Sequence, residues 1–161
     1  MSEYVLDASA LLAMLQEETG SAVVLRHVFE SWISAVNMAE VYGKLASRGV
    51  PAESMFEIAS GAVKGIVPFS ERQARLTAEL LPQTRALGLS LGDRACLALA
   101  IERELPVLTT DKAWKTLRVG VEIRLIRRHL SLKQKRRTRA LRFSRLLLCS
   151  PSSSACPQHQ T

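Results

Sequence analysis

The amino-acid sequence predicts an α/β fold in which helices flank both faces of a central parallel β-sheet. Short apolar runs of strand length alternate with longer segments whose apolar residues recur at helical spacing. This alternation is typical of parallel strands that are joined by helices and buried on both faces. The chain has 161 residues and no internal repeat, which fits one domain large enough to bury a core.

The first half of the sequence contains two strand signals and four helix signals. Tyr4 to Leu6 is a short apolar run that suits a buried strand, and leucines at helical spacing follow it. Gly20 interrupts the chain, and Pro51 suits the first position of a helix. We therefore expect strands at 4–6 and 32–36 and helices at 8–16, 22–29, 37–47 and 51–63. The buried side of the 22–29 helix is expected to carry Val24, Leu25, Val28 and Phe29.

The second half continues the alternation. Ser70 followed by Gln73, and Ser90 followed by Asp93, have the capping-box spacing that marks the start of a helix. Pro82 is expected to kink or end the first of these helices, and the second is expected to run to Glu104. We expect strands at 66–69, 106–109 and 121–126 and a short helix at 111–117.

The basic charge of the protein is concentrated at its C-terminal end. The net charge is +7 and the pI is about 9.8, but residues 127–161 contain nine lysines and arginines and no acid. Subtracting nine from +7 leaves −2 for residues 1–126, so nucleic-acid binding by the body cannot be argued from its pI. We expect a domain at 1–126 and a basic, Ser-rich, disordered extension at 127–161.

Composition excludes several classes of protein. No apolar run is long enough to cross a bilayer, and the N-terminus does not resemble a signal peptide, so we expect a cytoplasmic protein without membrane contact. The three cysteines show no C-x-x-C spacing, which argues against a disulfide framework and a zinc ribbon. Any metal ion should therefore be a hard ion that oxygen atoms hold.

Four acidic residues are expected at one edge of the predicted sheet. Asp7 and Asp111 follow strands, and Glu40 and Asp93 lie near the starts of helices. Because the carboxyl ends of parallel strands share one edge, these acids from distant parts of the sequence should meet there.

Each acid also has a simpler interpretation. Asp7 and Asp111 could cap helices, and Asn37 with Glu40 and Ser90 with Asp93 both have capping-box spacing. Four carboxylates at one edge repel one another unless a cation compensates them, however. Mg²⁺ or Mn²⁺ is the natural ion for such a set, and this site could promote hydrolysis of a phosphodiester.

The same residues lie in motifs that resemble those of PIN-domain ribonucleases, specifically the VapC-type toxins of type II toxin–antitoxin systems. The matching segments are VLDASALL at 5–12, SAVNMAEV at 34–41, LSLGDRACLALA at 89–100 and VLTTDKAW at 107–114. Their order and spacing agree with the family over roughly residues 3–126.

The resemblance implies a PIN-like fold and a Mg²⁺- or Mn²⁺-dependent endoribonuclease acting on RNA. It further implies a VapB-like antitoxin partner, and we expect a homodimer. Catalytic and metal-binding roles would fall on Asp7, Glu40, Asp93 and Asp111. Ser9 and Thr110 match small hydroxyl positions near the site, and Arg94 flanks an acid and could contact phosphate or form a surface ion pair.

Three other readings compete with a nuclease. A phosphoacceptor receiver domain needs an aspartate at the end of a middle strand, and this sequence offers none there. A haloacid-dehalogenase-like phosphatase needs D-x-D after its first strand, where this chain has Asp7-Ala8-Ser9. A catalytically silent PIN-like protein that binds RNA or protein stays open. Trp32 and Trp114 could stack on RNA bases, although core packing is favoured for both.

Overall fold

The fold is built on a five-stranded parallel sheet, seen in a computed structural model that describes residues 3–126. The strands run in the order β3-β2-β1-β4-β5, and every neighbouring pair is parallel. Their bounds are β1 Tyr4–Leu6, β2 Ser31–Ser34, β3 Gly65–Val67, β4 Val107–Thr109 and β5 Ile123–Leu125. The expected fold class is thereby confirmed, whereas the predicted extension at 127–161 lies outside the described residues.

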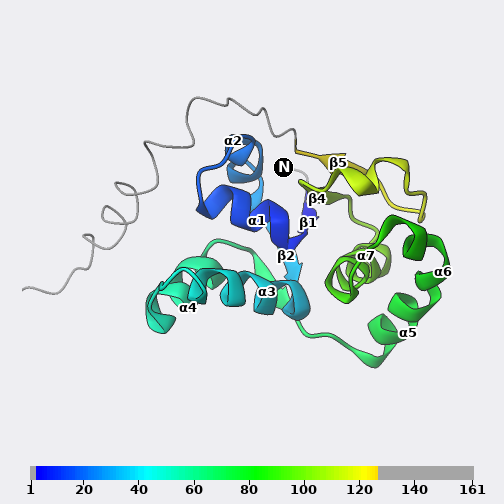
Figure 1. The fold of residues 1–161 in the computed structure, drawn as a ribbon, viewed down its shortest axis with the longest axis horizontal. Helices are drawn as coiled ribbons and strands as arrows, with labels where there is room; N and C mark the ends of the chain where they lie inside the picture. The colour runs from blue at the N-terminus through cyan, green and yellow to red at the C-terminus, as the bar shows by residue number, and fades with distance from the viewer. Residues whose placement is uncertain (1–2, 127–161) are drawn as a thin grey trace, which may run out of the picture. The chain divides into compact units, whose positions relative to one another are not determined.

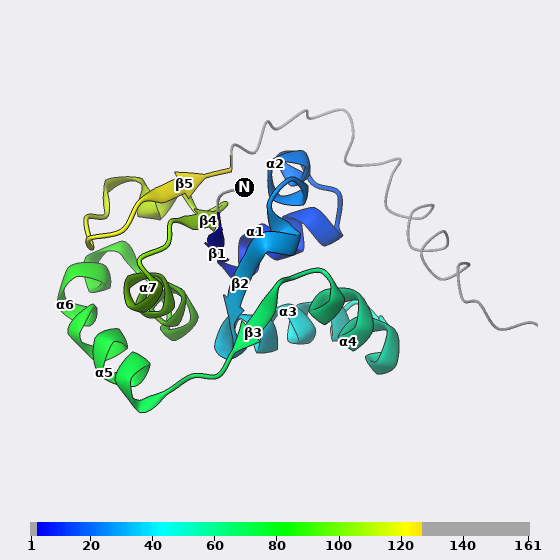
Figure 2. The same ribbon diagram turned by 180° about the vertical axis from the view of Figure 1, so that it is seen from behind.

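Helices cover both faces of this sheet (Figures 1 and 2). On one side lie α1 (Ala8–Leu15), α3 (Ala35–Ala46) and α4 (Ala52–Gly61), and on the other lie α5 (Glu71–Glu79) and α7 (Leu91–Arg103). Shorter elements connect them: α2 (Ser21–Leu25), η1 (Val28–Glu30), α6 (Leu81–Thr84), η2 (Arg85–Leu87) and η3 (Lys112–Thr116). None of the helices within residues 3–126 is long and apolar enough to cross a membrane.

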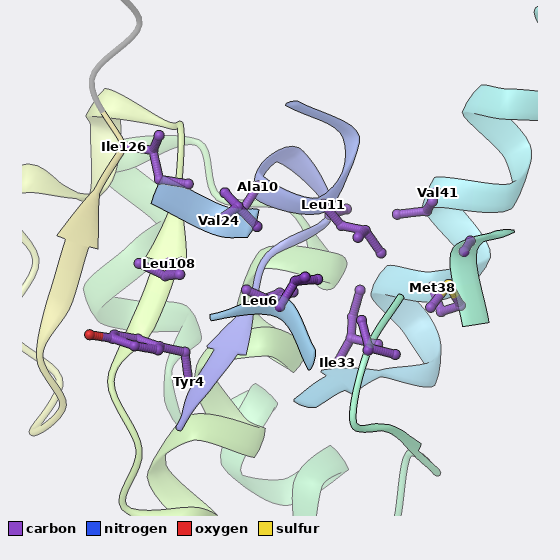
Figure 3. Packing of buried hydrophobic residues seen from close by; sticks show 14 of the residues in the cluster. Tyr4, Leu6, Ala10, Leu11, Val24, Ile33, Met38, Val41, Leu108 and Ile126 are labelled. Carbon is purple, nitrogen blue, oxygen red and sulfur yellow. The ribbon is translucent and has the colours of Figure 1, made fainter. Parts of the chain in front are cut away.

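Strand residues alternate between two hydrophobic cores. Tyr4 and Leu6 of β1 pack with Leu11, Ile33 and Met38 in the core beneath α1 and α3 (Figure 3). Val5, the residue between them, points to the opposite core, which contains Leu97 and Trp114. Because both faces are covered there, every residue of the strands β1 and β4 is buried.

The expected helix at 22–29 is wrong as a single element. The chain forms α2, turns, and then forms the 3₁₀ helix η1. Val24 and Val28 are fully buried as expected, but Leu25 and Phe29 are 57% and 64% exposed. The expected burial of Leu25 and Phe29 assumed one continuous helix with a single buried face. Because the helix breaks between α2 and η1, that face is interrupted and both side chains are exposed.

The helix α3 begins two residues earlier than expected. Ala35 and Val36, which we expected at the end of a strand, form its first turn, because the Ser34 side chain accepts a hydrogen bond from the Val36 backbone N–H at 3.3 Å. Asn37 therefore lies inside the helix and does not cap it. This removes the capping-box explanation for Glu40.

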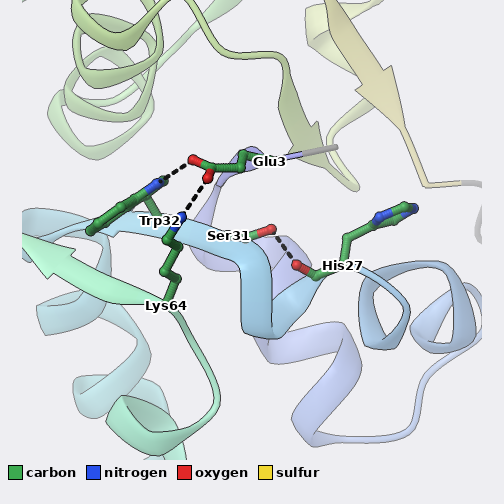
Figure 4. Close-up of polar contacts among 5 residues, drawn as sticks. All are labelled: Glu3, His27, Ser31, Trp32 and Lys64. Atoms are coloured by element: carbon green, nitrogen blue, oxygen red, sulfur yellow. Dashed lines mark hydrogen bonds and ion pairs between the residues drawn. The ribbon is translucent and has the colours of Figure 1, made fainter. Parts of the chain in front are cut away.

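The two tryptophans occupy different environments. Trp114 is fully buried, which confirms its expected core position. Trp32 is half-buried at the amino ends of the strands, where its indole N–H donates to Glu3 at 2.9 Å and Lys64 pairs with the same carboxylate (Figure 4). The Arg103 guanidinium lies 4.0 Å from the centre of the Trp32 ring. These contacts hold Trp32 within the fold at the edge of the sheet opposite to the acids.

Candidate active site

Asp7 lies at the carboxyl end of the central strand β1 and is almost completely buried. Its backbone N–H donates to the Leu108 carbonyl at 3.0 Å, which fixes it beside the end of β4. Its side chain also caps α1, because it accepts a hydrogen bond from the Ser9 backbone N–H at 3.3 Å. The capping interpretation is therefore correct for Asp7, but capping a helix does not require a carboxylate to be buried.

The Asp7 carboxylate is surrounded by hydrogen-bond donors. Its Oδ2 accepts from the Thr109 hydroxyl at 2.9 Å and from the Ser9 hydroxyl at short range. Its Oδ1 accepts from the side-chain amide of Asn37 at 3.4 Å. The donors come from α1, α3 and β4, so three separate segments of the chain set the orientation of this one carboxylate.

The pKa of Asp7 is raised from 3.8 to about 6. Burial is the main cause, because it removes water from the charged form, and the nearby charge of Asp93 adds to it. The hydrogen bonds from Ser9 and Thr109 oppose the shift without cancelling it. Asp7 is thus a buried acid whose charge is under-compensated by the protein alone.

Asp93 lies in the first turn of α7 and forms the expected capping box with Ser90. Its carboxylate accepts from the Ser90 backbone N–H at 2.6 Å, and its own N–H donates to the Ser90 hydroxyl at 3.2 Å. The next residue, Arg94, donates to the Leu89 carbonyl at 2.8 Å. Arg94 thereby stabilises the turn before α7, and no surface ion pair of this side chain is found within residues 3–126.

Glu40 is exposed on the second turn of α3 and approaches the start of α7. A Cβ added to Gly92 would lie 3.3 Å from the Glu40 Oε2, so the Glu40 carboxylate lies close to the Gly92 backbone. The carboxylates of Glu40 and Asp93 therefore flank the same short segment of backbone.

Asp111 follows β4 and caps η3, where its carboxylate accepts from the Ala113 N–H at 2.9 Å. Its backbone N–H donates to the Thr109 hydroxyl at 3.1 Å, which links it through Thr109 to Asp7. Its side chain is exposed. Within residues 3–126, no three acidic, histidine or cysteine side chains already form a set that could hold a metal ion. The structure thus brings Asp7 within reach of the charge of Asp93 and links Asp111 to Asp7 through Thr109. Glu40 lies against Gly92, the residue before Asp93, and the side chains of Glu40 and Asp111 are exposed.

Two residues that contact Asp7 were missed from the sequence. The threonine hydroxyl that donates to Asp7 is that of Thr109 and not that of Thr110. Thr110 instead donates its backbone N–H to the Ser9 hydroxyl at 3.1 Å. Asn37 is fully buried and bridges Asp7 to the Gly92 carbonyl. The sequence did offer a signal for Asn37, because this polar residue stands among apolar ones shortly after a buried strand.

The potential ligands at this edge are oxygen atoms. Within residues 3–126 the one thiol is that of Cys96, and burial, aided by the charges of Asp7 and Asp93, raises its pKa well above the ordinary value. A protonated thiol is a poor metal ligand. A set of carboxylate and hydroxyl oxygens suits a hard divalent ion such as Mg²⁺ or Mn²⁺.

Comparison with solved structures finds the same fold in several toxin–antitoxin proteins. A toxin–antitoxin complex from Klebsiella pneumoniae aligns with a TM-score of 0.58 at 19% identity, covering 74% of this chain and 99% of that chain. FitAcB from Neisseria gonorrhoeae aligns with a TM-score of 0.58 at 20% identity, covering 74% and 95%. VapC20 from Mycobacterium tuberculosis, described as a sarcin-ricin loop cleaving toxin, aligns with a TM-score of 0.58 at 15% identity, covering 75% and 99%.

A comparison with curated proteins found no match. A family model does match, however: the PIN domain model covers residues 4–120, which include all four candidate acids and most of the described structure. At these identities the solved structures support the fold alone, and the family model supplies the membership. The chain belongs to the PIN-domain family.

Proposed function

We propose that this protein is a divalent-metal-dependent endoribonuclease and the toxin of a toxin–antitoxin pair. The observation that carries the proposal is Asp7, a buried carboxylate with a raised pKa beside a second acid, Asp93. Helix capping accounts for one hydrogen bond to Asp7, but it does not account for the burial of a carboxylate near a like charge. A cation would offset both the desolvation and the repulsion.

Asp7, Asp93, Glu40 and Asp111 would hold the metal ion. The residues fit it, because their donor atoms are oxygens and because burial and the charge of Asp93 raise the pKa of Asp7. When bound, the ion would act as a Lewis acid on a phosphodiester and lower the pKa of a water molecule.

The protein's own residues would orient this chemistry. Ser9 and Thr109 donate to the Asp7 carboxylate and so limit how far it has to reorganise when RNA binds. The Ser90 capping box holds the first turn of α7 and therefore the position of Asp93. Glu40 and Asp111, which are exposed, remain available to the solvent side, where a phosphate would approach.

We expect the purified protein to cleave RNA in Mn²⁺ or Mg²⁺ and to lose this activity in EDTA.

A pair of variants separates the charge of Asp93 from its role in the capping box of α7. Asp93→Asn keeps an oxygen that can cap α7 but removes the charge, and should slow cleavage about 100-fold or more. Ser90→Ala removes the cap but keeps the charge, and should cost about 1 kcal/mol of stability with a much smaller loss of activity. Cleavage should be followed on a labelled RNA, with unfolding in urea as the second readout. Equal cleavage by wild type and Asp93→Asn would show that Asp93 has no catalytic role. If the wild type cleaves no RNA, the alternative of a catalytically silent PIN-like binding protein is favoured.

The proposed protein partner is a VapB-like antitoxin, which would bind a homodimer of this protein. Two features favour a protein partner: the acid-rich edge with a net charge of −2 for residues 1–126, and exposed apolar side chains of Val23, Leu25 and Phe29 on neighbouring elements. The solved relatives include several toxin–antitoxin complexes.

Co-expression with the small protein encoded next to it should yield one complex on size-exclusion chromatography. The complex should cleave RNA more slowly than the free protein, because a basic segment bound at the acids would exclude phosphate. Elution of the two proteins as separate species would contradict the partner.

A further inference from the structure

The side chain of Asn37 connects two of the candidate acidic segments. Asn37 is fully buried on the first turn of α3. Its Nδ2 donates to the Asp7 Oδ1 at 3.4 Å and to the Gly92 backbone carbonyl at 3.1 Å. Gly92 directly precedes Asp93, so one amide group contacts Asp7 itself and the backbone that carries Asp93.

The chemistry of its neighbours fixes the orientation of this amide. Both facing atoms, a carboxylate oxygen and a carbonyl oxygen, can only accept hydrogen bonds. The NH₂ group is the part of the amide that can face both. An aspartate of the same shape would place oxygen against oxygen at each contact, so an amide suits this position and a carboxylate does not.

Stability alone does not explain a polar residue at this place. The Asn37 Oδ1 is buried and has no hydrogen-bond partner among residues 3–126, an arrangement that destabilises a fold. Neighbouring positions of α3 carry apolar side chains such as Met38 and Val41. The two donors directed at Asp7 and Gly92 are therefore what the asparagine provides that an apolar residue would not.

Asn37 donates to the Asp7 oxygen that Ser9 and Thr109 do not contact. Ser9 and Thr109 donate to Oδ2, whereas Asn37 is the only side chain within residues 3–126 found to donate to Oδ1. Loss of this contact would leave the Asp7 carboxylate free to rotate about the Oδ2 anchor.

From these contacts we infer that Asn37 is a positioning residue for the metal site. Its amide restricts the rotation of the Asp7 carboxylate. The same amide ties Asp7 to the start of α7 and so fixes the separation between Asp7 and Asp93. The inference rests on the proposed metal-dependent function and adds to it a residue outside the acidic set. Residues that orient metal ligands typically alter metal affinity or activity by about 10–100-fold when changed.

The test is Mn²⁺ binding to the purified full-length protein, measured by calorimetry or by the electron paramagnetic resonance signal of free Mn²⁺. Asn37→Leu keeps the volume but removes both donors, and should weaken Mn²⁺ binding about tenfold or more. Asn37→Ser is a smaller variant that cannot overpack the helix and cannot reach Asp7, and should show a similar loss. In cleavage assays, kcat at a fixed Mn²⁺ concentration should fall while KM for RNA stays within about twofold, because Asn37 is buried away from substrate.

Gln73→Leu is the matched control. Gln73 is another buried amide with an unpartnered oxygen, but it lies on α5 and its Nε2 donates to Glu102 at 2.6 Å. Gln73→Leu should leave Mn²⁺ binding unchanged. Wild-type affinity in both Asn37 variants, or equal losses in the Asn37 and Gln73 variants, would overturn the inference, as would a wild-type protein that binds no Mn²⁺. A wild type that binds Mn²⁺ but cleaves no RNA would contradict the proposed nuclease activity. The comparison of Mn²⁺ affinities would still test the role of Asn37.

Discussion

Asp7→Asn is expected to lower metal-dependent RNA cleavage by at least about 1000-fold while leaving a folded protein. The substitution keeps the size of the side chain and one oxygen that can accept from Ser9 and Thr109. It removes a charged ligand at the centre of the candidate site, and the metal ion held there would supply several kcal/mol of transition-state stabilisation. Since each 1.36 kcal/mol changes a rate tenfold, the loss should exceed that of any other single acid.

The measurement is single-turnover cleavage of a labelled RNA, with Mn²⁺ varied up to millimolar concentration. Asp7→Asn should not be rescued by more Mn²⁺ if the ligand itself is lost. Glu79→Gln on α5 removes the same charge from an exposed acid outside the candidate site and serves as the control. Cleavage by Asp7→Asn at a rate within tenfold of wild type would contradict a metal-ligating role for Asp7.

The fold could be predicted from the sequence where a segment signals its own structure. The strand at 4–6 and the long helix near 90–104 were correct, because a short apolar run and a capping box followed by an apolar face are local features. The segment at 22–29 failed because its apolar pattern does not show where the helix breaks. A periodic pattern assigns a buried face only for as long as the helix continues.

The candidate site divides in the same way. The four acids could be picked out because Asp7 and Asp111 follow strands, and Glu40 and Asp93 lie within the first two turns of helices. Whether Thr109 or Thr110 faces Asp7 depends on the pairing of β1 with β4, in which Leu6 lies opposite Leu108. That register, and the contact of Asn37 with the Gly92 carbonyl, join segments far apart in the chain. Periodicity and spacing carry no information about such contacts.

The metal-free protein should lose stability as the pH rises from about 4 to 7, through Asp7. The folded state raises the pKa of this acid from 3.8 to about 6 by burial and by the charge of Asp93, so the folded protein binds the proton more tightly than the unfolded chain. The stabilisation is fully present below about pH 4 and is lost as the pH rises through 6. A shift of this size corresponds to about 3 kcal/mol.

Urea unfolding in EDTA at pH 4, 5, 6 and 7 measures this loss, and Asp7→Asn isolates it. Every other group titrates in both proteins, so the difference between their free energies of unfolding should change by about 2.4 kcal/mol between pH 4 and pH 7, in favour of Asp7→Asn at pH 7. Mn²⁺ at about 100 times its Kd should return about 2.7 kcal/mol to the wild type at pH 7 and nothing to the variant. Parallel pH profiles for the two proteins would mean that Asp7 is charged at no cost without a metal ion. The strongest physical reason for placing a cation beside it would then be gone.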